Sequence, residues 1–333
     1  MSFSDTYDPT KSVLSGPGSA VSNREDLTDV LSILAPEETP VLSSASKQRA
    51  SSTFVEWTVD SLADVSTAGV SEGADVTSFT DKFSGRARLG NYTQKFRRDY
   101  MVSDLQEAVD SVGPAKIAQA EAKAIRELKR DVEATLLSDN EMSAEDGAGT
   151  PYKLRGLGKW IQNGAQTTNP VPESFRTPTT SIKEDASTLL ESEFNDLITS
   201  IYRETGTTNS LTLVADTALR RVISDFARIG VSGENREFNV SGDSGTIRLS
   251  VELYQSDHGV VSIINMNPDC APDTTNKDTG YLVNPEYYGV HELIPMGSTR
   301  LPNLGGGERG YVDCSLTLGV YHPQAHGKIT TIA

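Results

Sequence analysis

The feature that most constrains the fold of this chain is a long amphipathic helix predicted over residues 113–138. Apolar side chains recur there at spacings of three and four, and charged side chains fill the remaining surface. Pro114 suits the first turn of a helix, because the amide that it lacks would have no partner there. At 1.5 Å per residue, roughly 25 residues form a rod of about 37 Å, against a mean helix of about 11 or 12 residues. We expect this rod to pack on one side only, along Ala118, Ala122, Ile125, Leu128, Val132 and Leu136.

The first fifty residues predict an arm that has no core of its own. Residues 1–20 are rich in Ser, Gly and Pro and show no periodicity, which is typical of an extended segment. Ser22 and Glu25 form a capping box at the start of a short helix, which Pro36 ends. Its four apolar residues are too few to fold alone, so the arm should dock elsewhere through Leu27, Val30, Leu31 and Leu34.

Residues 51–100 predict a protruding two-stranded hairpin. Residues 53–59 alternate, with Val55, Trp57 and Val59 on one face. A polar stretch over residues 61–80 follows, and a second extended segment covers residues 82–100. That returning segment is basic in an otherwise acidic protein, through Lys82, Arg86, Arg88, Lys95, Arg97 and Arg98.

The charged and aromatic side chains of this hairpin have two interpretations. The basic residues form either a solvated strand face, the common fate of a charge run, or contacts to acidic faces of neighbouring subunits or to DNA. An exposed hairpin rarely persists without a partner to cover it, so both interpretations remain open. The aromatic residues are either packing residues or interface residues, and the contact candidates comprise the six basic residues with Trp57, Phe83, Tyr92 and Phe96.

The remainder of the chain predicts an α+β fold with helices on one side of antiparallel sheets. A capping box from Ser181 to Glu184 predicts a helix that ends at Gly206, with a stripe through Leu190, Phe194, Leu197, Ile198 and Ile201. Asp216 begins a second helix. Strands are expected over residues 211–214, 246–254, 259–265, 281–283, 287–293 and 311–321, and the turn between residues 256 and 259 predicts a hairpin.

Two short motifs suggest catalytic or metal-binding chemistry, and neither has the partner residues that such a site needs. Gly242–Gly245 copies the loop around the nucleophile of chymotrypsin-like proteases, yet all four histidines follow Ser244, whereas those enzymes place the histidine first. His322 and His326 are four apart, but Pro323 prevents a helix that would place both on one face, so we expect a turn there. The sequence therefore predicts no catalytic residue, metal site or cofactor.

Composition narrows the function further. The formal charge of −16 argues against a protein whose main task is to grip nucleic acid, because phosphate binding needs a basic surface. No secretory signal is recognisable, and the longest apolar run is too short to cross a bilayer, so we expect no membrane partner. Cys270 and Cys314 fit buried, reduced thiols of a protein made in a cytoplasm.

The order of these parts resembles the Hong Kong ninety-seven-type capsid fold of tailed bacteriophages. Local stretches are similar to one family of phage capsid proteins, in the same order along the chain: residues 23–27 with 38–41, 56–60, 254–261, 314–320 and 325–329. The resemblance spans nearly the whole chain. It implies an N-terminal arm (1–50), an extended loop (51–100), a peripheral domain with a spine helix (101–180), an axial domain (181–280) and a return to the peripheral domain (281–333).

The resemblance also implies a function. A major capsid protein of this type assembles as hexamers and pentamers into an icosahedral head around double-stranded DNA, which it touches without sequence preference. The implied partners are further copies of the chain, a portal protein, a scaffolding protein and a cement protein. The implied location is the virion, after assembly in the host cytoplasm.

Two other functions remain open on the sequence alone. One is a different virion or encapsulating shell protein, although a tail-tube protein should lack the long helix. The other is a serine hydrolase that uses Ser244, which a serine-directed probe would label.

Overall fold

We describe a computed structural model of the chain over residues 38–83, 85–108, 116–206, 208, 211–226, 252–272 and 278–331. The predicted helix after Ser22, the start of the long helix at Pro114 and the loop around Ser244 lie outside these residues.

The long helix forms as predicted and organises one half of the fold. Helix α3 covers Lys116–Leu137, and Leu128, Val132 and Leu136 are fully buried on its inner face. The predicted stripe is wrong at the N-terminal end, where Ala118 and Ala122 are exposed. There Ala124 is buried, and Ile117 and Ala120 pack partly buried against the core. From Leu128 the buried face continues through Ala124, Ala120 and Ile117, in steps of four, four and three. Alanines also occupy the predicted positions 118 and 122, so the sequence did not distinguish the buried face from the exposed one.

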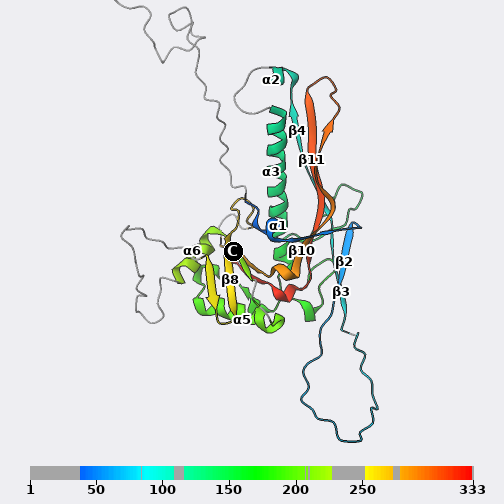
Figure 1. Ribbon diagram of the computed structural model, residues 1–333, viewed down its shortest axis with the longest axis vertical. Helices are drawn as coiled ribbons and strands as arrows, with labels where there is room; N and C mark the ends of the chain where they lie inside the picture. Colours follow the sequence, from blue (N-terminus) through cyan, green and yellow to red (C-terminus); the bar gives the residue numbers. More distant parts are fainter. Residues whose placement is uncertain are drawn as a thin grey trace, which may run out of the picture.

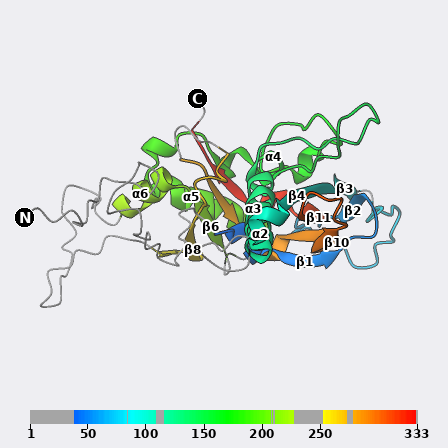
Figure 2. The ribbon, with the colours of Figure 1, turned by 90° about the horizontal axis from the view of Figure 1, so that it is seen from above.

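A four-stranded sheet lies against α3, with α3 seen end-on beside it in Figure 2. Its strand order is β1-β10-β11-β4. β10 and β11 form a long antiparallel hairpin, β4 pairs antiparallel with β11, and β1 pairs parallel with β10. The strands are β1 (Ser46–Arg49), β10 (Tyr288–Leu301), β11 (Glu308–Val320) and β4 (Gln94–Val102).

The predicted hairpin is present as β2 (Phe54–Val59) and β3 (Ala87–Tyr92), which pair antiparallel. The basic segment that follows residue 82 is not one extended arm. It divides at Thr93, because the Thr93 amide donates to the Thr53 carbonyl and β4 then joins the other sheet. Between β2 and β3 the chain leaves the body as a long loop, visible at the bottom of Figure 1.

The second half of the fold is a six-stranded sheet with helices packed on it, and its strand order is β5-β12-β9-β6-β8-β7. This sheet is mixed rather than antiparallel as predicted, since β6 runs parallel to β8 and β5 parallel to β12. The predicted hairpin between β7 and β8 is confirmed. The strands are β5 (Ile182–Lys183), β6 (Thr212–Ala215), β7 (Leu253–Ser256), β8 (Gly259–Asn265), β9 (Gly280–Val283) and β12 (Gly327–Ile329).

Helix α5 (Glu191–Thr205) begins ten residues later than the predicted start at Ser181. Ser181 ends a 3₁₀ turn, and the next two residues pair with β12, so the supposed capping box is not one. The side chain of Glu193 instead accepts the Leu190 amide at 3.0 Å, and Leu190 is exposed rather than part of the stripe. The left-handed cap at Gly206 is confirmed (φ 72°).

Short helices and turns complete the chain. Asp216 caps α6 (Thr217–Phe226) as predicted, accepting the Thr217 amide at 2.6 Å. Pro323 lies in the predicted turn before the last strand. The others are α1 (Pro40–Ser44), α2 (Asp104–Ala108), α4 (Leu157–Trp160), and 3₁₀ turns at Glu173–Phe175, Thr179–Ser181, Ala186–Thr188, Pro285–Tyr287 and Pro323–Ala325.

Buried side chains form two apolar clusters, one around α3 and the four-stranded sheet and one between α5, α6 and the six-stranded sheet. The domain boundaries given above remain a prediction.

Candidate assembly surfaces

The loop between β2 and β3 makes no close packing with the part of its own chain that the structure describes. Every residue from 60 to 83 is exposed. Large apolar side chains are among them, with Leu62 98%, Val65 95% and Phe79 90% exposed. Val70, Val76 and Phe83 are also exposed. Single exposed apolar residues are ordinary, but a series along one unsupported loop indicates a surface that another molecule covers. Phe83 was a predicted contact residue, whereas the other five lie in the stretch over residues 61–80 that was predicted to be polar.

Most of the predicted basic contact residues have acidic partners within the chain. The Arg86 Nε atom lies 2.7 Å from Asp60 Oδ2, and this hydrogen bond holds the pKa of Asp60 below its usual value. The Arg98 guanidinium donates two hydrogen bonds to the carboxylate of Asp131 in α3, at 2.6 and 2.7 Å.

Two more of the predicted basic residues form longer ion pairs. Arg88 of β3 lies 3.6 Å from Glu56 of β2, and Lys95 of β4 lies 3.1 Å from Asp313 of β11. Arg97 and Lys82 are exposed, and no ion pair to either is seen among the described residues.

The aromatic contact candidates divide between core and surface. Phe96 is 7% exposed, and Trp57 packs between Trp160 and Tyr321 with ring centroids 5.6 and 5.9 Å away. Tyr92 lies against Phe54, with centroids 4.6 Å apart. Phe83 alone is exposed, and the Arg86 guanidinium lies 4.2 Å above its ring. Trp57, Tyr92 and Phe96 are therefore packing residues within one chain, as one of the two interpretations predicted.

A second apolar surface lies at the far end of the four-stranded sheet, which we call the tip patch: Met101, Leu105, Leu301 and Leu304. These side chains are 67, 81, 43 and 80% exposed. In the strand register, Met101 and Leu301 flank Arg309 on the face opposite α3. The patch is held in shape by Asn303, whose amide group donates to Asp104 at 3.3 Å and whose oxygen accepts the Gly305 amide at 2.7 Å.

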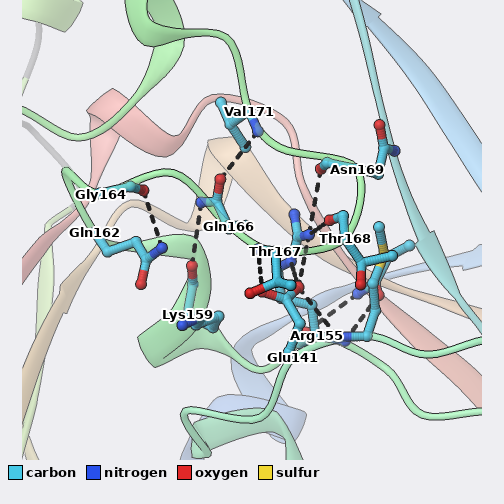
Figure 3. A network of polar contacts seen from close by, with 12 residues as sticks. Glu141, Arg155, Lys159, Gln162, Gly164, Gln166, Thr167, Thr168, Asn169 and Val171 are labelled. Atoms are coloured by element: carbon cyan, nitrogen blue, oxygen red, sulfur yellow. Dashed lines mark hydrogen bonds and ion pairs between the residues drawn. The ribbon is translucent and has the colours of Figure 1, made fainter.

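A buried arginine joins the chain segments that precede and follow α4 (Figure 3). Arg155 is fully buried, and its Nε and Nη2 atoms lie 2.8 and 2.7 Å from Glu141 Oε1. It also donates to the carbonyls of Thr168 and Asn169, so it gathers the segment that follows α4. Burial lowers the pKa of Arg155, and the Glu141 carboxylate opposes that shift.

Asn91 of β3 links this network to the sheet. Its amide group donates to the Arg155 carbonyl at 3.2 Å and to the Leu318 carbonyl at 2.8 Å, while its oxygen accepts the Arg155 amide at 2.8 Å. The hairpin is therefore anchored rigidly, and only its loop is free of the body.

A buried glutamate of α3 binds the backbone of α1. Glu133 of α3 is fully buried, and its two oxygens accept the amides of Val41 and Leu42 at 2.9 and 2.8 Å. Asn267 donates to the Glu38 carbonyl at 2.9 Å nearby. Burial raises the pKa of Glu133 to about 7, against the opposing effect of the two amides. No local pattern distinguishes Glu133 from the other charged residues of α3, so its burial could not be predicted.

The remaining titratable groups have structural surroundings. The Nδ1 atom of His326 accepts the Asn284 amide at 3.2 Å, and burial lowers the pKa of His326 to about 4. Cys270 and Cys314 are buried and unpaired. Within the described ranges, no group of three or more side chains could hold a metal ion. No helix in the described part of the chain has the length and apolarity needed to cross a membrane.

Comparison with solved structures places the fold among phage capsids. The capsid of a native GTA particle matches with a TM-score of 0.61 at 12% identity, over 97% of this chain and 100% of that chain. The capsid of cyanophage P-SCSP1u matches with 0.61 at 12% identity, over 95% of each chain. A structure from Mycobacterium phage Bobi matches with 0.62 at 10% identity, over 97 and 99%. The predicted Hong Kong ninety-seven-type fold is confirmed.

The family comparison covers almost the entire chain. No curated protein matches it in sequence. The sequence model of the SU10 major capsid protein family, in contrast, matches residues 9–333. The chain therefore belongs to the SU10 major capsid protein family, whose members build the shell of the virion.

Proposed function

We propose that the chain closes its shell as hexamers and pentamers whose contacts are made by the hairpin loop and the tip patch. One observation carries this proposal. Six large apolar side chains are exposed on a loop that no described part of its own chain covers, and four more lie at the tip. A chain that presents both surfaces at opposite ends of one body can contact more than one neighbour at a time.

The rigid anchoring of the hairpin supports this geometry. Because Asn91 and Arg155 fix the strand pair to β11, the loop leaves every subunit in the same direction. A loop of fixed direction can contact an equivalent site on each neighbour, as closed ring symmetry requires. The exposed Lys82, Phe83 and Arg97 fit contacts to neighbours better than Phe96, which the core already holds.

The acidic surface bears on the other proposed partners. With a net charge of −16, the chain should line double-stranded DNA without binding it tightly or with sequence preference. We further propose that a portal protein, a scaffolding protein and a cement protein act with it, and that assembly takes place in the host cytoplasm. These partners rest on the family alone, and none of them requires an enzymatic step by this chain.

Sedimentation of the purified chain tests the tip patch. Leu105→Asp with Leu304→Asp places two charges in the patch and should lower the assembled fraction about tenfold or more, since burying unpaired charges is costly. Leu190→Asp makes the same change at a leucine 61% exposed at the start of α5. It controls for folding and solubility. Unchanged assembly of the tip variant would contradict the proposed contact.

A further inference from the structure

The charge of the hairpin loop is the opposite of the charge of its stem. Residues 61–80 contain Asp64, Glu72 and Asp75 and no Lys, Arg or His. The basic residues belong to the strands and the last turn before them. A loop that is both apolar and acidic is repelled by DNA phosphates. Its apolar side chains nevertheless need a surface to cover them, so its partner should offer apolar walls with a cationic rim.

The same chain has a cleft of about 680 Å³ with a cationic lining, beside α4, β5 and β12. Ile182 contributes partly exposed apolar surface to its lining, and the fully buried Ile161 lies behind it. Lys159 of α4, Lys183 of β5 and Lys328 of β12 also line it. This volume falls within the range of about 300–1,000 Å³ typical of binding sites.

Two of these lysines are available to a partner. Lys328 is bound to Asp139 at 2.6 Å. Lys159 and Lys183 are half-buried, and within the described ranges neither forms an ion pair. Glu184 is the other acidic residue of the lining, so the cleft keeps an excess of positive charge. Half-buried cations beside apolar walls interact more strongly with an incoming carboxylate than fully solvated ones do.

We propose that the acidic, apolar loop of residues 61–80 docks in the lysine-lined cleft of a second copy of this chain. The loop is exposed over its whole length, so it does not occupy the cleft of its own subunit. Half of the excursion between β2 and β3, about 13 residues, reaches up to about 40 Å when extended, enough to cross to a neighbour. This inference rests on the proposed self-assembly and names the receiving site for one of its two surfaces.

A carbodiimide crosslink tests the contact directly. The reagent joins a carboxylate and an amine as an amide with loss of one water molecule, so it reports ion pairs at contact distance. Particles are grown from an equal mixture of ¹⁵N-labelled and unlabelled chain and then digested for mass spectrometry. Docking predicts peptides that join Glu72 or Asp75 to Lys159 or Lys183, half of them between labelled and unlabelled chains. Loop crosslinks confined to one chain, or to other lysines, would overturn the proposal.

Charge reversal tests its role in assembly. Lys159→Glu with Lys183→Glu should lower particle yield about tenfold, and Glu72→Lys with Asp75→Lys should do the same, because like charges then meet. The four changes together should restore most of the yield. Lys129→Glu with Lys153→Glu, an equal change at exposed lysines outside the cleft lining, is the matched control. A fourfold variant no better than the worse pair would overturn the docking.

The two proposals fail in different ways. Wild-type chain that forms no particles would count against the proposed self-assembly. The crosslinking is then repeated on concentrated subunits, where amides between the loop and the cleft of different chains support docking and their absence overturns it. Particles that form normally in all variants would leave self-assembly standing and remove the cleft as the receiving site.

Discussion

Replacing Glu133 with glutamine should change how the stability of the subunit depends on pH. The pKa of Glu133 is about 7 in the folded chain, against an ordinary value of 4.5. Between pH 4.5 and pH 7, the Glu133 carboxyl group is therefore protonated in the folded state and ionised in the unfolded state. At roughly 1.4 kcal/mol per pKa unit, the difference corresponds to about 3 kcal/mol.

The sign follows from the raised pKa. Stabilisation by the neutral carboxyl group is fully present below pH 4.5 and is lost as the pH rises through 7, because the buried group must then ionise. Glutamine stays neutral throughout. The unfolding free energy of wild type minus that of Glu133→Gln should therefore fall by about 3 kcal/mol between pH 4.5 and pH 8. Any pH-independent loss from the changed bonds to Val41 and Leu42 shifts the whole curve and leaves its slope unchanged.

Urea unfolding of dissociated subunits, followed by the fluorescence of the two tryptophans, gives both free energies at each pH. Taking the difference removes every other titrating group. Glu127→Gln, which alters a solvent-exposed pair with Lys123 on the same helix, is the control and should change stability by less than about 1 kcal/mol at any pH. A wild-type-minus-variant difference that stays constant from pH 4.5 to pH 8 would refute the reasoning.

Three further predictions concern buried groups. Arg155→Met leaves Glu141 without its partner and should cost about 3–5 kcal/mol in urea unfolding; adding Glu141→Met should recover part of that loss, and no recovery would contradict the ion-pair account. The pKa of His326 is about 4, so its neutral form contributes stability that is present above pH 6.5 and lost as the pH falls towards 4. His326→Gln removes this titration, so the loss of unfolding free energy between pH 6.5 and pH 4 should be about 3 kcal/mol smaller in the variant than in the wild type. Burial raises the pKa of Cys270 to about 11 and that of Cys314 to about 12, so neither thiol should react with a disulfide reagent at pH 8 until the chain unfolds; rapid labelling of the native chain would show that they are accessible.

Local sequence patterns predicted the elements whose side chains face one environment along their length. The periodicity of α3 arises from burial on one face. Helix α3 and strands β8 and β11 were each found near their expected ranges, although β11 is buried on both faces from Cys314 to Val320. The start of α5 was missed because Ser181 and Glu184 satisfy a capping pattern that also fits a turn followed by a strand. A short motif cannot distinguish these cases when tertiary pairing with β12 decides between them.

The candidate contacts could be predicted less well, because their partners are distant in sequence. Lys95 meets Asp313 and Arg98 meets Asp131 only once β4 is paired with β11 and packed on α3. A run of basic residues therefore suggested an open cationic surface that the fold largely neutralises. The apolar residues of the loop were visible in the sequence, but their exposure depends on the absence of any covering element, which a pattern does not reveal.

The cleft beside α4, β5 and β12 and the buried Glu133 could not be predicted at all. The cleft is lined by residues from positions 139 to 330. Its lysines are separated along the chain and follow no motif. Glu133 is one of several acids along α3, the others of which are partly exposed, and its burial beside α1 depends on tertiary packing that a local pattern does not reveal.

Electron microscopy of particles formed by the purified chain tests the central claim most directly. The account predicts closed icosahedral shells in which five-fold and six-fold rings share one subunit fold, with the hairpin loop of each subunit covered by its neighbour. A chain that stays monomeric at high concentration, alone and with a co-expressed scaffolding protein, would contradict it.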